Sequence, residues 1–350
     1  MVTSQRLSYR RVSQHEVDVF HSLCLDPHVK RYLLDGLDIS RTWAVDAVRQ
    51  SDRLFGGEEV GMWLVQREDT RIGFCGFHVF DELGPEPQLL YAFTGEHAGF
   101  GYATEAATAM IAETERLGWS RVVAAVDRPN GASVRVIEKV GFVGCGRVPG
   151  VLGDTLLFER FCEQRPTRVS AAPGTRWVLP IQQTWDGVTL GPDEVVQVEL
   201  ELGDLELTLR VDAPFHNDAP PDSADLWRHE VVEVMLVGTD DIYLEVELSP
   251  HSRHLVLFLH GIRTVTHRDV VLDYRAEIAG NRWRGVARIP MGWVPVATRR
   301  INAFAMHGTG PRRRYLAWKP TLGPQPDFHR LGEFGSLDDA DIMRGARPLG

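Results

Sequence analysis

A chain of 350 residues, 43% hydrophobic and 25% charged, is too long for one ordinary core and predicts two domains of ordinary soluble composition. Its net charge of −10 argues against a nucleic-acid partner, because such proteins present a basic surface. No apolar run suits a signal peptide or a membrane span, and the four cysteines lack CxxC spacing. We therefore expect a cytoplasmic protein with reduced thiols and without a membrane partner.

The first half of the chain, residues 1–165, alternates helical and strand patterns. Ser13 stands three residues before Glu16, the spacing of a capping box at a helix start. In chain order the patterns predict a strand at 7–11, helices from 13 and at 41–54, strands at 62–66, 72–80 and 88–94, a helix to 117, a strand at 122–126, a helix at 132–140 and strands to 161. This alternation predicts an α/β domain.

The composition changes over residues 163–175, which contain two prolines and small polar residues, and we predict a linker at 166–175. Beyond it the helical period nearly disappears. Short β-type runs follow at 195–202, 205–211, 231–237, 242–248, 255–259, 273–278, 283–289 and 301–306. Their spacing predicts an all-β sandwich over 176–337, followed by a C-terminal tail at 338–350.

A turn with two glycines joins the strand at 88–94 to an alanine-rich helix. Gly99 and Gly101 let the backbone direct its amides toward one point without an obstructing side chain. The start of the helix adds unsatisfied N–H groups and a positive dipole end, which suit a diphosphate. Taken alone, the motif also fits a simple strand-to-helix turn, and it matches neither the dinucleotide fingerprint nor a Walker loop.

A second motif follows the strand at 122–126. Asn130 can cap the next helix, Ser133 lies in its first turn, and Gly141 can end it. The order of strand, GxG and helix, then strand, NxxS, helix and KxGF, resembles the GNAT N-acetyltransferases over residues 5–161. The similarity is to the branch that includes ribosomal-protein N-terminal acetyltransferases. It implies a GNAT fold with a mixed sheet, and transfer of an acetyl group from acetyl-CoA to a primary amine.

The resemblance also implies which residues hold acetyl-CoA. The pyrophosphate would contact the backbone amides of Ala98, Gly99, Phe100, Gly101, Tyr102 and Ala103. The pantetheine arm would pair with Leu90, Tyr91, Ala92, Phe93 and Thr94, because two parallel strands splay in this fold and leave unpaired edge groups. Asn130 would lie beside the arm. Ser133 would face the departing thiolate as a proton donor, or would satisfy a backbone group in the first helical turn.

Three positions depart from the pattern of the family. Glu96 and Phe100 stand where a cation or Gln is usual, and Gln88 stands where several relatives carry an acidic residue. The general base is therefore not assigned, and three surface residues are candidates: Glu82, Glu86 and His97. We take Ser133 and Glu86 as the catalytic residues to be tested. The alternative function is a weak or inactive GNAT shell that binds CoA, or a carbohydrate through its C-terminal domain.

The second half resembles the DOMON-like β-sandwiches and the related family-nine carbohydrate-binding modules over about residues 176–335. Most of its six tryptophans are expected in the core, and Trp227 is the candidate for stacking on a sugar. A metal could be suspected from His229, His251 and His254 together with Glu230, Glu233, Glu245 and Glu247. Strand alternation places Glu245 and Glu247 on one face and Glu230 and Glu233 on opposite faces. We expect salt bridges or a solvated face rather than metal ligands, with Ca²⁺ held by oxygens as the lesser alternative. The expected partner is a small-molecule or peptide amine; a carbohydrate ligand and an oligomer stay open.

Overall fold

The computed structural model describes residues 2–162, 167–218, 225–268, 270–308 and 310–342. The chain divides into two compact units, Met1–Arg165 and Pro166–Gly350. Within the described part of the chain, no helix combines the length and the apolar character needed to cross a membrane. Of the predicted linker, residue 166 lies outside the described residues, whereas the carbonyls of Thr167 and Arg168 accept hydrogen bonds from Ala297 and Thr298 of the C-terminal unit.

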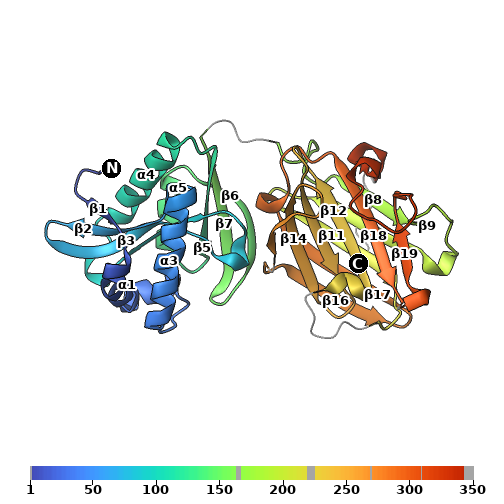
Figure 1. Ribbon diagram of the computed structural model, residues 1–350, viewed down its shortest axis with the longest axis horizontal. Coiled ribbons are helices and arrows are strands. Elements are labelled where there is room, and N and C mark those ends of the chain that lie inside the picture. The colour runs from blue at the N-terminus through green and yellow to red at the C-terminus, as the bar shows by residue number, and fades with distance from the viewer. Residues whose placement is uncertain (1, 163–166, 219–224, 269, 309, 343–350) are drawn as a thin grey trace. The chain divides into compact units, whose positions relative to one another are not determined.

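The N-terminal unit contains a seven-stranded mixed sheet in the order β1-β2-β3-β4-β5-β7-β6 (Figure 1). All neighbouring strands are antiparallel except β4 and β5, which run parallel. Its elements are β1 (Ser8–Arg11), α1 (Val17–Cys24), α2 (Pro27–Leu33), α3 (Arg41–Gly57), β2 (Met62–Arg67), β3 (Thr70–His78), β4 (Gln88–Phe93), α4 (Tyr102–Arg116), β5 (Arg121–Asp127), α5 (Gly131–Lys139), β6 (Val143–Gly150) and β7 (Gly153–Phe161).

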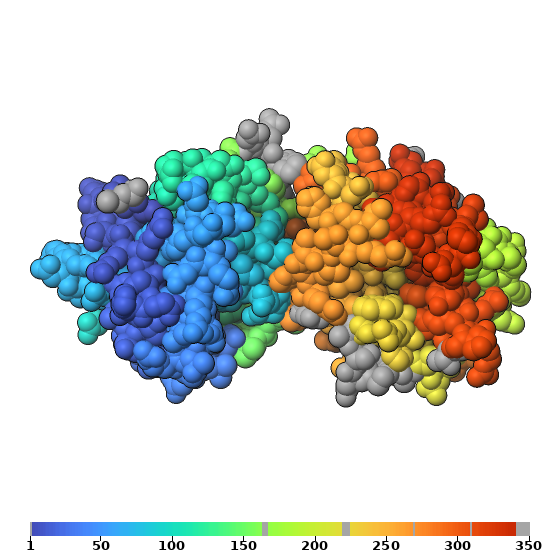
Figure 2. Space-filling model, viewed as in Figure 1, coloured from blue at the N-terminus to red at the C-terminus, as the bar shows by residue number. Residues whose placement is uncertain are grey.

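Helices cover both faces of this sheet, so successive residues of a central strand enter different cores. Leu89 of β4 packs with Ala106 of α4 and Ile137 of α5, whereas the next residue, Leu90, packs with Val48 of α3 on the other face. The polar side of α3 faces solvent, and its blue atoms line the surface of the N-terminal unit in Figure 2. The mixed α/β architecture predicted from the sequence is confirmed.

Two local predictions near the N-terminus need correction. The Ser13 hydroxyl donates to the Glu16 carboxylate at 3.0 Å and makes no capping bond to the backbone. Glu16 also pairs with Arg10 at 3.1 Å, which draws its carboxylate away from a capping box, and a 3₁₀ turn (Gln14–Glu16) precedes α1. Helix α2 was not predicted from the sequence, although Asp26 caps it and Pro27 is its first residue, both standard start signals.

The C-terminal unit is rich in antiparallel strands, as predicted. Its strands are β8 (Arg176–Ile181), β9 (Gln183–Thr184), β10 (Val196–Leu202), β11 (Glu206–Pro214), β12 (Val231–Val237), β13 (Ile242–Leu248), β14 (His254–His260), β15 (Val265–Arg268), β16 (Asp273–Ala279), β17 (Arg282–Pro290), β18 (Arg300–His307), β19 (Arg314–Ala317), β20 (Gly335–Ser336) and β21 (Asp341–Ile342). One sheet has the order β16-β17-β11-β10-β8-β21, and the other β15-β14-β13-β12-β18-β19-β9, with β20 beside β18. Likeness to DOMON-like sandwiches stays a prediction.

The centre of the larger sheet is buried on both faces. Every residue of β12 is buried, although a strand with one solvated face would alternate. The face carrying Val231 and Met235 packs against Leu226, Phe328 and Phe334 of the connecting segments. These segments therefore form a covering layer over this face of the sheet. Of the predicted tail at 338–350, residues 343–350 lie outside the described residues.

Candidate acetyl-transfer site

The turn between β4 and α4 has the backbone that a phosphate-binding loop requires. Gly99 and Gly101 adopt φ angles of +84° and +81°, a region that favours glycine. Gly101 is the N-cap of α4 and supplies no side-chain cap. Among the described residues, the backbone N–H groups of 99–104 donate to no protein group, whereas the predicted ligand Ala98 already donates to the Gly95 carbonyl at 3.3 Å. The free amides are thus those of 99–104, at the positive end of a fifteen-residue helix.

β4 and β5 separate beside this turn. Among the described residues, Gln88 and Val123 are their only pair of partners, whereas β4 pairs with β3 along its whole length. The Thr94 N–H donates to the carbonyl of Ile72 in β3, so alternation along the strand directs the N–H groups of Tyr91 and Phe93 to the other edge of β4. The predicted splay is present, and it leaves two main-chain donors facing the gap.

A pair of hydroxyl groups joins β4 to α5. The Tyr91 hydroxyl lies 2.8 Å from Ser133 Oγ and 3.2 Å from the Ser133 carbonyl oxygen. Burial raises the pKa of Tyr91 to about 12, so the phenol keeps its proton at neutral pH. Asn130 Oδ1 accepts the Ser133 N–H at 3.1 Å and caps α5. The helix cap therefore fixes the backbone of the residue whose hydroxyl meets Tyr91.

Arg6 supplies a positive charge at this turn, and its position there was not predicted from the sequence. Its guanidinium donates to the Phe100 carbonyl at 3.1 Å, lies 4.7 Å from the centre of the Tyr102 ring, and pairs with Glu105 at 2.7 Å. Phe100 itself is 58% exposed. Because Arg6 is 94 residues away from Phe100 in the sequence, no local motif could have identified it.

The candidates for a general base lie in different surroundings. Glu86 Oε1 is 2.5 Å from Arg121 Nη1, and Arg121 also pairs with buried Glu159 at 2.9 Å. Glu82 is exposed in a short 3₁₀ turn (Asp81–Leu83). His97 Nδ1 lies 2.8 Å from Thr94 Oγ1, just beyond β4. The structure therefore does not bring Glu86 and Ser133 together through any contact among the described residues.

Two further side chains, Gln88 and His78, lie where β3 and β4 pair, and neither of them is an acid. Gln88 is buried, and its Oε1 accepts the Phe80 N–H at 2.8 Å, so this side chain braces the loop before β4. His78 pairs with Gln88 across the two strands. It is buried without a partner at Nδ1 in the described chain, and burial lowers its pKa to about 4. His78 is thus a neutral imidazole on the face of α1–α3.

In the C-terminal unit, Trp227 is 36% exposed, whereas Trp177, Trp283, Trp293 and Trp318 are buried. The expected burial of most tryptophans is confirmed; a role of Trp227 in sugar binding stays a prediction. The expectation of a solvated face is wrong for Glu233, Glu245 and Glu247, which are 2%, 4% and 0% exposed. The covering layer described above buries them, and this long-range packing is not visible in strand periodicity.

Three consecutive arginines at 312–314 connect the end of a 3₁₀ turn (Gly310–Arg312) to the start of β19. Two of them make contacts inside the unit. Arg313 donates to the carbonyls of Trp227 and Gly308, and Arg314 pairs with Glu194 at 2.8 Å. This use of the arginines inside the unit leaves less charge for an anionic partner.

Comparison with known proteins finds a family model and two kinds of relatives. Residues 6–143 match the family model described as "Acetyltransferase (GNAT) domain". The UPF0462 protein C4orf33 homolog of Rattus norvegicus is 38% identical over 168 residues, which cover 44% of this chain and 84% of that protein. The uncharacterized N-acetyltransferase YoaA of Bacillus subtilis is 26% identical over 146 residues, or 41% of this chain and 82% of its own length.

A solved structure of RimL, a ribosomal L7/L12 alpha-N-protein acetyltransferase in complex with coenzyme A, is 19% identical with a TM-score of 0.40, covering 46% of this chain and 96% of that one. GNAT acetyltransferases use acetyl-CoA, and the free amides of the turn and of the β4 edge fit such a cofactor. The chain therefore belongs to the UPF0462 family, and its N-terminal unit contains a GNAT acetyltransferase domain whose cofactor is acetyl-CoA.

Proposed function

We propose that the N-terminal unit transfers an acetyl group to a primary amine of a small molecule or a peptide. The observation that carries the proposal is the splay beyond the Gln88–Val123 pair, which leaves free amides beside the Tyr91–Ser133 hydroxyl pair. Hydrogen-bond donors for a diphosphate, for an extended arm and for a leaving group are then provided by the turn before α4, by β4 and by Ser133 of α5. Direct attack of the amine needs no covalent intermediate with the protein.

Acetyl-CoA supplies a thioester that is activated toward amines. In the proposal the amides of Gly99–Ala103 bind its diphosphate, and Arg6 adds a cation at the same turn. The N–H groups of Tyr91 and Phe93 orient the arm along β4 and offer hydrogen bonds to a developing negative charge. These contacts would exclude water from one side of the gap and fix the reacting end near α5.

The hydroxyl pair would hold the proton that the departing sulfur needs. Ser133 Oγ can donate this proton while it accepts one from the Tyr91 hydroxyl, because the two oxygens are 2.8 Å apart. The raised pKa of Tyr91 keeps the pair protonated through the neutral range. General acid help of this kind is typically worth about 10²–10⁴-fold in rate, and two linked donors would share it.

Glu86 is the base that the proposal tests first. Its contact with Arg121 orients the carboxylate and competes with proton acceptance. If Glu86 accepts the amine proton, Glu86→Gln lowers kcat by about 10²–10⁴-fold, whereas Glu82→Gln on the neighbouring exposed turn leaves kcat unchanged. Equal kcat values in wild type and Glu86→Gln would exclude Glu86 as the base.

The function is tested with the full chain, acetyl-CoA and a panel of peptide, polyamine, aminoglycoside and amino-sugar acceptors, with release of free CoA as the readout. The expected result is release that depends on the acceptor and falls in Ser133→Ala and Tyr91→Phe. Acetyl-CoA binding without CoA release for any acceptor would refute the transfer and favour a binding protein.

We also assign the 168-residue match with UPF0462 proteins to the C-terminal unit. Residues 6–143 are already matched by the GNAT domain, and the C-terminal unit, Pro166–Gly350, is long enough for the whole match. In this assignment the β-rich unit is the part that defines the UPF0462 family, and the acetyltransferase is fused to it. The proposal predicts that a fragment of residues 166–350 binds no acetyl-CoA.

A further inference from the structure

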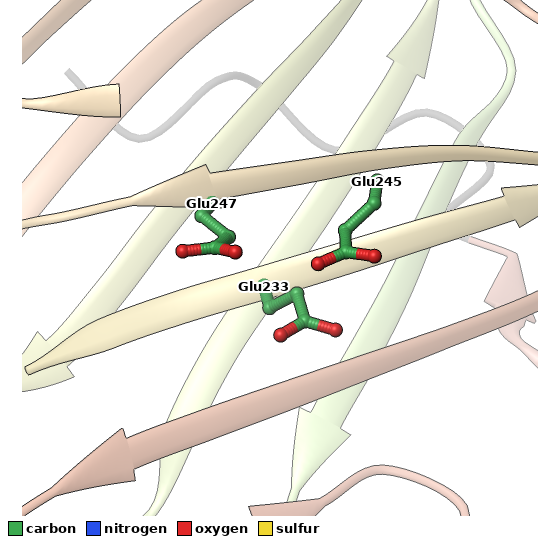
Figure 3. A group of neighbouring side chains, drawn as sticks. All are labelled: Glu233, Glu245 and Glu247. Carbon is green, nitrogen blue, oxygen red and sulfur yellow. The ribbon is translucent and has the colours of Figure 1, made fainter. Parts of the chain in front are cut away.

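Three glutamates converge on one face of the larger sheet in the C-terminal unit. Glu233 of β12 is the direct cross-strand partner of Glu247 of β13, and Glu245 lies two residues from Glu247 on the same face. One oxygen atom from each side chain lies within 4.8 Å of those of the other two. Figure 3 shows the three carboxylates turned toward one another from the two neighbouring strands.

These carboxylates are shielded from solvent, and most of their oxygen atoms lack a hydrogen-bond partner among the described residues. The three residues are at least 96% buried. Among the described residues, Glu233 Oε1, Glu245 Oε2 and both oxygens of Glu247 have no hydrogen-bond partner. Buried polar groups in native proteins are nearly always paired, and a buried carboxylate without a partner is costly. Four unpaired oxygen atoms that point into one space therefore indicate a missing positive species.

The surroundings of the cluster are apolar. Leu255 and Leu257 of β14 lie directly beside Glu247 and Glu245 in the sheet, and Phe304 of β18 lies beside Glu233. Burial, followed by the charges of Glu245 and Glu247, raises the pKa of Glu233 well above its usual value. Arg268 is the cation whose charge lowers the pKa of Glu247, but one cation offsets one of three charges.

A histidine from the covering layer reaches the same cluster. His329 Nε2 lies 4.0 Å from Glu245 Oε2, and its other ring nitrogen, Nδ1, lies 2.8 Å from the Tyr243 hydroxyl. Tyr243 also accepts the Arg263 N–H at 3.0 Å. Burial lowers the pKa of His329 to about 4, so the ring is neutral. A neutral imidazole with one nitrogen held by a hydroxyl and the other aimed at carboxylates is the usual arrangement of a metal ligand.

We propose that Glu233, Glu245 and Glu247 bind one divalent cation, with His329 Nε2 as a nitrogen ligand and Tyr243 as the residue that positions it. Oxygen ligands of this kind suit Mg²⁺, Ca²⁺ and Mn²⁺, and an imidazole favours transition metals, so Mn²⁺ meets both preferences. With Arg268 nearby, three carboxylates and a dication come close to neutrality. The ion would connect β12 and β13 to the covering layer that carries His329.

The test uses the full chain, stripped with a chelator and titrated separately with Mn²⁺, Zn²⁺, Ca²⁺ and Mg²⁺ by calorimetry, with native mass spectrometry to count bound ions. We expect one Mn²⁺ per chain and a bound-state Mn²⁺ electron paramagnetic resonance signal. Loss of an oriented ligand partner typically weakens metal affinity about 10–100-fold, and we expect at least this loss in Glu247→Gln and Tyr243→Phe.

Glu230→Gln is the matched control. Glu230 is also a buried glutamate on the same segment, but its carboxylate already accepts the N–H groups of His216 and Asp218. The proposal requires this variant to bind Mn²⁺ as wild type does, and circular dichroism checks that each variant is folded. Absence of binding by all four cations at millimolar concentration, or equal affinity in folded Glu247→Gln, would overturn the site. Ca²⁺ selectivity that His329→Ala does not change would overturn the nitrogen ligand.

Discussion

Replacing Gly99 with alanine tests the phosphate-binding role of the turn before α4. Gly99 has a φ angle of +84°, and a Cβ atom built there has no heavy atom within 4 Å. The substitution therefore introduces backbone strain without a clash. A left-handed conformation costs a residue with a Cβ about 1–2 kcal/mol, which corresponds to a fall in Tm of about 2–8 °C for a unit of this size. If the turn changes conformation to relieve the strain, its N–H groups no longer point toward the diphosphate.

Gly118→Ala is the matched control, because Gly118 has a φ angle of +78° and equally open space after the end of α4. Both variants should lose similar stability. Only Gly99→Ala should weaken acetyl-CoA binding, by about 10–100-fold, because a hydrogen bond to a charged group is worth about 1.5–3 kcal/mol and each 1.4 kcal/mol is tenfold in affinity. Calorimetric titration and a melting curve measure the two effects. Equal affinity in both variants would refute the assignment of the diphosphate to this turn.

Four further outcomes follow from the geometry. Arg6→Ala should raise KM for acetyl-CoA several-fold with kcat unchanged, because Arg6 lies at the Phe100 carbonyl and not at the hydroxyl pair; an unchanged KM would exclude its role. Tyr91→Phe should lower kcat at least tenfold. The pH–rate profile of the wild type should nevertheless show no fall caused by ionisation of Tyr91 below pH 10, since its pKa is about 12. Equal kcat values in wild type and Tyr91→Phe would exclude a role of the hydroxyl pair. Iodoacetamide should label Cys162 alone in the native protein, because the other three cysteines are buried and burial raises the pKa of Cys24 to about 12; mass spectrometry counts the labels. Without metal, stability should fall as pH rises from about 4.5 to about 7, because burial raises the pKa of Glu245 from 4.5 to about 7 and the folded state then holds the extra proton; a rise in Tm over this range would contradict it.

The sequence predicted those parts of the site that depend on local chain geometry. Gly99 and Gly101 follow a strand and precede a helix, and each needs a positive φ angle, so the turn could be identified within a short stretch of sequence. The cap of α5 by Asn130 was predictable for the same reason. Arg6 was not, because its contact with the turn depends on where the first segment of the chain returns to α4.

The glutamate cluster shows a different limit. The period of a strand correctly placed Glu245 and Glu247 on one face, and correctly separated Glu230 from Glu233. It could not indicate that this face is buried, because the residues that cover it, including Phe328 and Phe334, come about 80 residues later. A charged residue on a strand is normally read as solvated. Only tertiary packing shows that three carboxylates lie in an apolar layer.

The two units differ in how much stability each loses when its binding site is empty. Residues 99–101 of the turn are exposed, so water can satisfy their free amides, and loss of acetyl-CoA should leave the N-terminal unit folded. The carboxylates of Glu233, Glu245 and Glu247 have no such access, and an unpaired buried charge is strongly destabilising. A chelator should therefore lower one thermal transition in scanning calorimetry, that of the C-terminal unit, and acetyl-CoA should raise only the other. Because a bound ion stabilises by mass action, added Mn²⁺ should restore the first transition in wild type and fail to do so in Glu247→Gln. A chelator effect of equal size in both proteins would place the cation elsewhere in the chain.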